Sequence, residues 1–298
     1  MQSIHYIERS TGILKQEVVP KEQWLKWLYH NPIGKSALHL VVKKKFLSAW
    51  YGRKMDAPAS SKKIPGFIRQ VQVNMAESAV PASDFKSFND FFIRRLKPDA
   101  RPIDPLPESI VSPADGKLLA FADMRGFDTF FVKGQVFSLE KFLGNRTLAE
   151  RYTNGTLLII RLAPVDYHRF HFPADGVISS SQVINGSYCS VSPYAVQNRL
   201  RIYWENKRAY SLLETIRAGD IVLCEVGATM VGSIVQAYEP ESQVRKGQEK
   251  GWFKFGGSTV IVLLEKGKIL VDNDLLENTR KGFETSITVG ERVGVACG

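Results

Sequence analysis

Gly251-Trp-Phe-Lys-Phe-Gly-Gly-Ser-Thr-Val-Ile-Val-Leu-Leu-Glu265 contains a pair of adjacent glycines, Gly256 and Gly257, followed by an apolar segment rich in β-branched residues. The part Thr259–Leu264 predicts a buried strand, because it is short, continuous and rich in valine and isoleucine. Gly256 and Gly257 can adopt backbone conformations closed to other residues, and they leave the Gly257 carbonyl open to the hydroxyl of Ser258. This geometry suits attack of the serine on its own preceding peptide bond, although the same turn also occurs as a plain loop. It matches neither a phosphate loop nor the serine elbow of hydrolases.

Similar short runs recur through the last two thirds of the chain, separated by Gly, Asn and Asp turn signals. They are Lys117–Ala122, Thr129–Val132, Thr156–Leu162, Val177–Ile184, Arg208–Thr215, Asp220–Glu225, Met230–Gln236 and Lys268–Val271. The pattern predicts a mostly antiparallel β domain, and we expect the chemistry to lie in it.

The first third of the chain has a different pattern. Over residues 20–54, Trp, Leu, Val and Phe alternate with Lys and Arg, which predicts two amphipathic helices separated at Pro32 and Gly34. Helices of this composition lie in membrane interfaces, and they also pack on ordinary protein cores. Ser87–Leu96 predicts one further short helix.

Five prolines between Pro98 and Pro113 exclude a regular helix there and mark a boundary. A length of 298 residues allows one large domain or a core with an appendage. The sequence therefore predicts an α+β fold. Its N-terminal helical region occupies residues 1–104, and the mostly antiparallel β domain that carries the active site occupies residues 105–298.

The composition, with 44% hydrophobic and 23% charged residues, is that of an ordinary globular protein and excludes disordered, collagen-like and coiled-coil chains. The net charge of +10 is concentrated at one end. Residues 1–100 hold 17 Lys and Arg against 8 Asp and Glu, whereas the rest of the chain holds 23 against 22. A localised basic region indicates an anionic partner, either acidic lipid head groups or nucleic acid, and a solvated basic face is the alternative.

Neither a membrane span nor a secretory signal is expected. The longest apolar stretches, such as Val260–Leu264, are far shorter than the roughly 18 residues that cross a bilayer. Met1–Ser10 lacks the continuous apolar region of a signal peptide. Cys189, Cys224 and Cys297 are too few and too scattered for a disulfide framework or a thiolate zinc site, so we expect a reducing, cytoplasmic setting.

Two of the five histidines, His168 and His171, share the segment Ala163-Pro-Val-Asp-Tyr-His-Arg-Phe-His-Phe-Pro173 with Asp166 and Arg169. A spacing of three places two side chains on one face of a helical turn but on opposite faces of a strand. One shared site therefore requires this segment to turn. The alternatives are a pair of structural histidines or, with a third ligand that the local sequence does not supply, a metal site.

An Asp-Gly pair lies in Val111-Ser-Pro-Ala-Asp-Gly-Lys117, where Asp115 and Gly116 form a turn before a strand. An Asp-Gly pair at such a position most often serves only to form the turn. A function for Asp115 therefore depends on its context in the whole chain.

Taken together and in their order, several segments resemble the phosphatidylserine decarboxylases, which are pyruvoyl-dependent carboxy-lyases of phospholipid biosynthesis. The resemblance runs from about Phe85 to the C-terminus, and the N-terminal third matches much less. Gly256 stands where the family often has leucine. This difference leaves the Gly257–Ser258 bond of the family's cleavage motif in place. The matching segments are Phe88-Asn-Asp-Phe-Phe-Ile-Arg-Arg-Leu96, Arg101-Pro-Ile103, Ser112-Pro-Ala-Asp-Gly116, Val132-Lys-Gly134, Asp166-Tyr-His-Arg-Phe-His171, Val226-Gly-Ala228, Val231-Gly-Ser-Ile234 and Phe255-Gly-Gly-Ser-Thr259.

The resemblance implies a proenzyme, or zymogen, that makes its own cofactor by autocatalytic cleavage. Ser258 would attack the carbonyl carbon of Gly257 and convert the amide into an ester. Elimination would then release a β chain, residues 1–257, from an α chain, residues 258–298. The dehydroalanine left at position 258 would hydrolyse to a pyruvoyl group and ammonia. The two fragments would remain together as a heterodimer.

The resemblance also assigns roles to four side chains. Asp115, His171 and Ser258 match the family's self-cleavage residues, with imidazole as the base and the carboxylate fixing its tautomer. His168 matches a family histidine implicated in the decarboxylation step, where a proton must be supplied to the product.

The implied reaction converts phosphatidylserine to phosphatidylethanolamine and carbon dioxide, through a Schiff base between the pyruvoyl carbonyl and the substrate amine. Neither pyridoxal phosphate nor a metal is expected. The implied partners are the lipid substrate and an anionic membrane surface, which the basic N-terminal region would contact from the cytoplasmic side as a peripheral protein of the cell membrane. Nucleic acid is not expected, and homo-oligomerisation is left open.

Three other hypotheses about the function compete with that of a phosphatidylserine decarboxylase. A basic adaptor without chemistry would explain the N-terminal charge but not the segments around Asp115, His171 and Ser258. A hydrolase would use the same three residues on an external substrate, and its serine would remain intact. A zinc enzyme would be built on His168 and His171.

Overall fold

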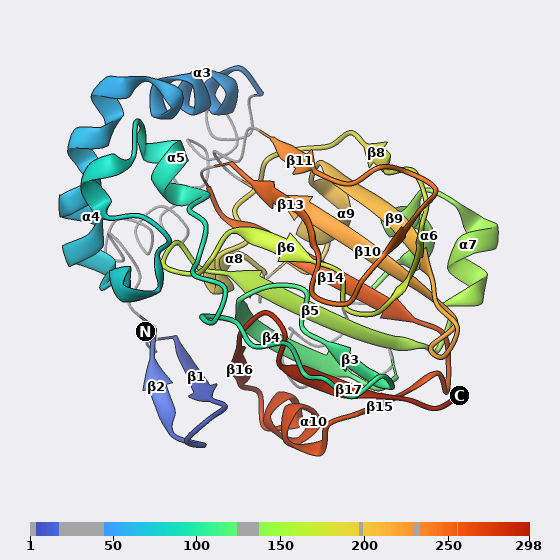
Figure 1. The fold of residues 1–298 in the computed structure, drawn as a ribbon. Coiled ribbons are helices and arrows are strands. Elements are labelled where there is room, and N and C mark those ends of the chain that lie inside the picture. Colours follow the sequence, from blue (N-terminus) through green and yellow to red (C-terminus); the bar gives the residue numbers. More distant parts are fainter. Residues whose placement is uncertain (1–3, 18–44, 124–136, 197–198, 229–232, 255) are drawn as a thin grey trace.

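The protein has an α+β architecture in which antiparallel sheets are joined to a helical N-terminal part (Figure 1). This fold class is the one predicted from the sequence. A computed structural model describes residues 4–17, 45–123, 137–196, 199–228, 233–254 and 256–298. Within these ranges, no helix combines the length and the apolar character needed to cross a bilayer.

The largest sheet has 11 strands, and all its pairs are antiparallel except one. The strands are β1 (His5–Glu8), β2 (Leu14–Gln16), β4 (Gly116–Phe121), β5 (Thr156–Leu162), β7 (Gly176–Ile178), β8 (Gln182–Ile184), β9 (Arg208–Glu214), β10 (Asp220–Gly227), β12 (Ser242–Val244), β14 (Ser258–Leu264) and β16 (Glu284–Ile287). Their order is β12-β7-β9-β10-β14-β5-β4-β16-β1-β2, and β8 also pairs with β9.

Two three-stranded sheets complete the β domain. The first has the order β11-β13-β6, with β6 (Arg169–His171), β11 (Ile234–Gln236) and β13 (Glu249–Phe253). The second has the order β15-β17-β3, with β3 (Ser109–Val111), β15 (Ile269–Val271) and β17 (Arg292–Ala296). In Figure 1 the sheet β11-β13-β6 lies over the large sheet.

The central strands β4, β5, β10 and β14 are buried on both faces, which explains why they read as continuous apolar runs. On one face, Leu158 and Val260 pack with Phe170 of the sheet β11-β13-β6. On the other face, a second core includes residues of the short helices. These helices are α6 (Leu139–Leu143), α7 (Arg146–Arg151), α8 (Pro193–Val196) and α9 (Ile202–Glu205), and α10 (Asn273–Arg280) lies against β4 and β16.

The N-terminal helices have an aromatic core of their own. The elements are α3 (Lys45–Asp56), α4 (Ile64–Val71), α5 (Phe88–Phe92) and 3₁₀ helices at Pro58–Lys63, Met75–Glu77 and Ala82–Asp84. Phe88 and Phe91 are buried there, and Phe67 meets both edge-on. Val165 of the β domain packs against this core, so the helices are joined to the loop that precedes β6.

The first strands are a feature that the sequence did not predict, since residues 1–104 were expected to be helical. β1 and β2 form a hairpin whose first strand pairs in parallel with β16, Tyr6 opposite Glu284. Each of these two strands is too short for its apolar and polar pattern to predict a strand or its partner far along the chain. The predicted helices over residues 20–54 lie mainly outside the described residues, and α3 is their described end.

A buried ion cluster fastens this hairpin to the sheet. The guanidinium of Arg161 on β5 is almost fully buried and bonds two carboxylates, Glu17 at 3.1 Å and Glu284 at 2.9 Å. Glu17 directly follows β2, and Glu284 begins β16. One side chain therefore ties the N-terminal hairpin and β16 to β5 at the centre of the sheet.

We expect Arg161→Met to destabilise the fold by about 3–5 kcal/mol, because it leaves two carboxylates buried without their cation. Arg151→Met is the matched control, since Arg151 pairs with two carboxylates, Asp220 and Glu265, at the surface. The control should cost about 1 kcal/mol or less. Urea denaturation followed by circular dichroism measures both. Equal stability of the two variants would contradict the assignment of Arg161 as the fastening residue.

Candidate active site

The glycine turn before β14 adopts the special backbone that the sequence suggested. Gly256 has φ of 143°, a value that side chains disfavour. At Gly257, which follows, an added Cβ would make ordinary van der Waals contacts with Val191 at 3.4 Å and Ala228 at 3.8 Å. The peptide between Gly257 and Ser258 thus has apolar neighbours and no side chain of its own on the glycine side.

Ser258 begins β14 and is completely buried. Its backbone is opposite Leu162 of β5 and Gly227 of β10, and its Oγ has no hydrogen-bond partner among the described residues. Side chains alternate along a strand, so Ser258 shares a face with Val260, which packs in the same core as Phe170 of β6. The serine therefore faces the layer that carries the two histidines.

His168 is completely buried just before β6. Its carbonyl accepts a hydrogen bond at 3.0 Å from the N–H of Phe253, on the strand that leads to the glycine turn. Its ring centroid lies 3.9 Å from that of Phe92, and neither ring nitrogen has a partner in the described part of the chain. Burial, together with the nearby Arg94 guanidinium, holds the pKa of His168 well below its usual value, so the imidazole is neutral at pH 7.

His171 is the last residue of β6, and its N–H donates to the carbonyl of Pro113 at 2.7 Å. Its Nδ1 lies 3.0 Å from the carbonyl oxygen of Gly247. Because a carbonyl only accepts, Nδ1 carries the hydrogen. Nε2, which is buried and has no partner in the described ranges, keeps its lone pair. Burial lowers the pKa of His171, against the opposing effects of Gly247, Glu249 and Asp115.

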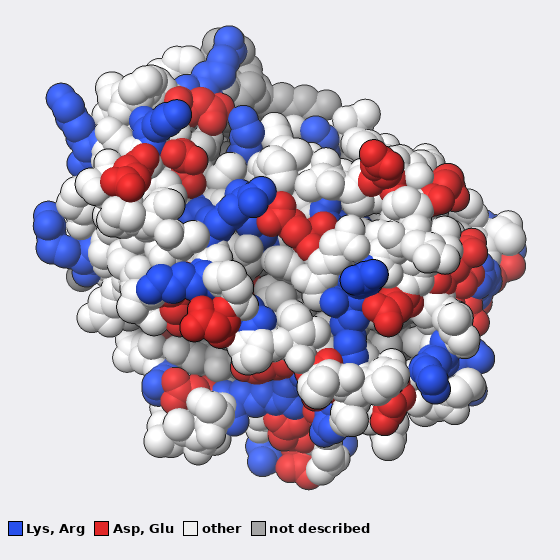
Figure 2. Space-filling model, viewed as in Figure 1, with Lys and Arg blue, Asp and Glu red and all other residues white. Residues whose placement is uncertain are grey.

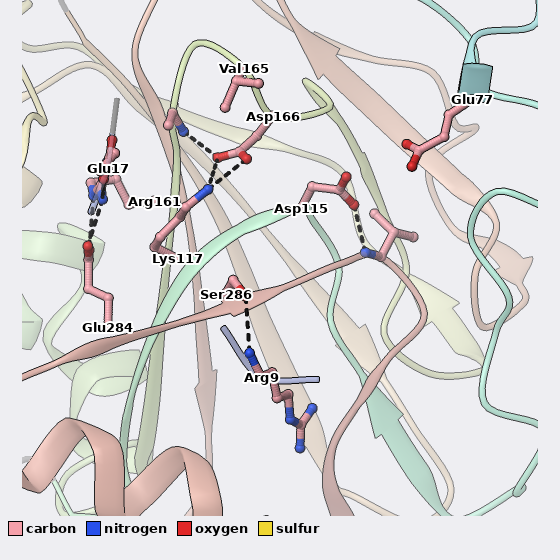
Figure 3. A network of polar contacts seen from close by, with 12 residues as sticks. Arg9, Glu17, Glu77, Asp115, Lys117, Arg161, Val165, Asp166, Glu284 and Ser286 are labelled. Carbon is pink, nitrogen blue, oxygen red and sulfur yellow. Dashed lines mark hydrogen bonds and ion pairs between the residues drawn. The ribbon is translucent and has the colours of Figure 1, made fainter. Parts of the chain in front are cut away.

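The Asp115 carboxylate lies at the start of β4 and is held from two sides. The guanidinium of Arg101 binds both its oxygens, with Nη2 to Oδ2 at 2.6 Å. The N–H of Val289 donates to Oδ1 at 2.8 Å, the bond drawn at Asp115 in Figure 3. Arg101 also forms an ion pair with Glu77 at 2.9 Å. Burial raises the pKa of Asp115, and the Arg101 guanidinium opposes this rise.

Asp166 folds the segment that carries the histidines. Its carboxylate accepts from the N–H of Ala163 at 2.7 Å and from Nζ of Lys117 at 2.9 Å (Figure 3). Its own N–H donates to the carbonyl of Ala163 at 2.9 Å. The chain thus turns before His168, but Arg169–His171 is the strand β6, so the turn that we expected between the two histidines is not observed.

These contacts link the expected site residues indirectly. Pro113 joins the Asp115 segment to His171, and Phe253 joins His168 to the strand before Ser258. Within the described residues, no direct hydrogen bond connects Ser258 to a histidine or Asp115 to His171.

Sequence reasoning missed three of the partners described above. Arg94 and Arg101 stand in segments quoted for the family resemblance, yet no local pattern assigns a contact to either. The Gly247 carbonyl has no sequence signal at all, because any residue supplies a backbone oxygen. Among the described residues, no group of three or more His, Cys, Asp or Glu side chains is placed to hold a metal ion.

Comparison with known proteins agrees with the resemblance of these segments. A family model described as phosphatidylserine decarboxylase matches residues 88–295. Proteins named phosphatidylserine decarboxylase proenzyme are 53% identical in Fusobacterium nucleatum, 47% in Clostridium novyi and 44% in Desulfitobacterium hafniense. Each alignment covers 98% of this chain and at least 98% of the relative. The chain therefore belongs to the phosphatidylserine decarboxylase family.

Proposed function

We propose that the chain is a self-cleaving proenzyme whose mature form decarboxylates phosphatidylserine to phosphatidylethanolamine. The bond that breaks is Gly257–Ser258, and Ser258 becomes the pyruvoyl group. The observation that carries the proposal is the setting of Ser258. Its buried hydroxyl has no hydrogen-bond partner among the described residues, and it directly follows a glycine whose neighbour, Gly256, has a positive φ. The names of the relatives, which include the word proenzyme, support it.

The surroundings of Ser258 suit a pyruvoyl group. Ser258 is closed to solvent, and the side chains nearest to the adjacent Gly257 are the apolar ones of Val191 and Ala228. The Ser258 hydroxyl is a polar atom without a hydrogen-bond partner among the described residues. When formed, the pyruvoyl group supplies a carbonyl that accepts the electrons released as carbon dioxide leaves. Pairing of β14 with β5 and β10 would keep residues 258–298 attached to residues 1–257 as a heterodimer.

Self-cleavage begins with the transfer of the Ser258 hydroxyl proton to a base. The oxygen then attacks the Gly257 carbonyl carbon, the peptide nitrogen leaves with a proton as an amine, and an ester forms. Elimination of the Gly257 carboxylate breaks the chain and leaves dehydroalanine at position 258. Water then hydrolyses this residue, through its imine tautomer, to the pyruvoyl group and ammonia. We assign the base to His171, because the Gly247 carbonyl fixes its hydrogen on Nδ1 and leaves Nε2 free to accept. Asp115 stabilises the resulting imidazolium through its charge, which already acts on His171.

We assign His168 to the later step, in which the product carbon receives a proton. A neutral imidazole still carries one N–H, and both ring nitrogens of His168 are free of protein partners among the described residues. Phe92 shields one side of the ring, which excludes water from the proton path.

The function is tested by incubating the purified protein with phosphatidylserine vesicles and measuring phosphatidylethanolamine and carbon dioxide. We expect both products in equal amounts from the wild type and neither from Ser258→Ala, which lacks the hydroxyl. Product formation by a Ser258→Ala chain would exclude a cofactor made from this residue.

The two histidines should separate the two steps. We expect His171→Ala to stay uncut, because the serine loses its base. His168→Ala should be cut but should turn over phosphatidylserine about 10²–10⁴ times more slowly, the usual effect of removing a general acid or base. Gel electrophoresis measures cleavage, and product formation measures turnover. The opposite pattern would exchange the two assignments.

The N-terminal helices supply the surface for membrane binding in our proposal, on the cytoplasmic side of the cell membrane. Trp50 on α3 is 49% exposed, and Nζ of Lys54 lies 5.2 Å from its ring centroid. Exposed Arg53, Lys62 and Arg69 extend this basic surface, and Figure 2 shows Lys and Arg side chains over α3 and α4. Such a surface attracts an anionic leaflet.

Reversing two of these charges should weaken binding to phosphatidylglycerol-containing vesicles at least tenfold, since each basic side chain near the surface contributes about 1 kcal/mol. The variant is Arg53→Glu with Lys54→Glu, and the measurement is co-sedimentation. The matched control, Arg146→Glu with Lys266→Glu, changes the net charge equally on exposed residues of the β domain. Equal weakening by both pairs would show that only net charge matters, and would contradict a membrane-binding face on the helices.

A further inference from the structure

The cavity beside Asp115 contains a buried cation, Arg94, to which the part of the chain that the structure describes supplies no carboxylate partner. It has a volume of about 340 Å³ and lies between the N-terminal hairpin, the 3₁₀ helix at Met75–Glu77 and the starts of β4 and β6. Its cationic side chains are Arg9, Arg94, Arg101 and Lys117. Figure 3 shows several of the residues that line it.

Three of these four cations are neutralised by protein carboxylates. Arg101 pairs with Asp115 and Glu77, and Lys117 pairs with Asp166. Arg9 pairs with Asp272 and Asp274. For Arg94, by contrast, the described residues supply no ion pair.

Arg94 is also deeply buried. Only 5% of it is exposed, and within the described residues its one hydrogen bond is from Nη2 to the carbonyl of Val165 at 3.1 Å. Its Nε and Nη1 are buried and have no partner in the described part of the chain. A buried guanidinium with two unpartnered nitrogens is costly unless an anion completes it.

The position of Arg94 is fixed relative to His168. Phe92, two residues earlier, contacts the His168 ring, and Nε of Arg169 donates to the carbonyl of Ile93 at 2.8 Å. The Arg94 bond to Val165 holds the loop before the histidine. Burial lowers the pKa of His168, and the charge of Arg94 adds to this effect.

We propose that Arg94 binds the phosphodiester of the lipid head group; the inference rests on the proposed function. The substrate carries two anions, a phosphodiester and the carboxylate that leaves as carbon dioxide. An arginine on the carboxylate would stabilise the ground state more than the transition state and would slow the reaction. The phosphodiester is unchanged in the reaction, and planar guanidinium donors match its oxygens.

The test is a kinetic comparison of Arg94→Met with the wild type on soluble dioctanoyl phosphatidylserine. We expect self-cleavage to be retained, KM to rise about 10- to 100-fold as on losing a charge-assisted hydrogen bond, and kcat to change much less. Arg95→Met is the matched control, because it removes the same charge from an exposed neighbour. It should change neither constant.

Two inhibitors distinguish the two anions. Dioctanoyl phosphatidylethanolamine has the phosphodiester without the carboxylate, and O-octylserine has the carboxylate without the phosphodiester. Arg94→Met should weaken inhibition by the first as much as it raises KM and leave inhibition by the second unchanged. If Arg94→Met instead weakens inhibition by O-octylserine and leaves inhibition by phosphatidylethanolamine unchanged, Arg94 binds the carboxylate and the proposal is overturned. An unchanged KM, or a loss confined to kcat, would also overturn it.

If Arg94→Met does not fold or mature, Arg94→Lys keeps the charge in place. KM and the phosphatidylethanolamine inhibition constant must then rise together by a smaller factor, and unchanged constants overturn the proposal. Direct binding of dioctanoyl phosphatidylethanolamine, measured by calorimetry on the same proteins, does not depend on turnover. A wild type that binds this lipid through Arg94 but forms no product would refute the proposed function and leave this inference standing.

Discussion

Strand β14 is paired along its whole length on both sides, and the cleavage site and the central core depend on this pairing. Each residue from Ser258 to Leu264 is opposite a residue of β5 and a residue of β10. The scissile bond lies immediately before the first pair. A break there would leave the paired strand intact, while the glycines outside it are free to rearrange.

Buried polar atoms without a partner in the described part of the chain include those of the candidate site residues, alongside others such as Ser192 and Ser211. Most buried charges elsewhere are compensated: Arg161 by Glu17 and Glu284, and Lys250 by Glu225 at 2.8 Å. By contrast, buried side-chain atoms of Ser258, His168, His171 and Arg94 have no partner among the described residues. Native proteins satisfy nearly all buried polar groups, so such a group of exceptions indicates a site that awaits another molecule or a chemical change.

The sequence predicted the strands best where local pattern determines them. Thr156–Leu162 was predicted and observed with the same bounds, because both faces are buried and the run is continuous. Val177–Ile184 was predicted as one strand, but the structure divides it into β7 and β8. Ser179 accounts for the break, since its hydroxyl accepts from the N–H of Leu212 and replaces a regular ladder contact. The predicted strand Thr129–Val132 lies outside the described residues.

Long-range partners could not be predicted, because they are set by the three-dimensional arrangement and not by neighbours in the chain. The bond of Asp115 to Arg101 and that of His171 to the Gly247 carbonyl are of this kind. Residue type and family resemblance were enough to nominate Asp115, His168, His171 and Ser258. Their roles remain predictions.

The central claim is that Ser258 both breaks the chain and becomes the cofactor, and the intact mass under denaturing conditions tests it most directly. The account predicts two chains, residues 1–257 and a fragment beginning at position 258 with the mass of a pyruvoyl terminus, and a single uncut chain for Ser258→Ala. A wild-type protein that remains one full-length chain after prolonged incubation, or a fragment that begins with an unmodified serine, would contradict it.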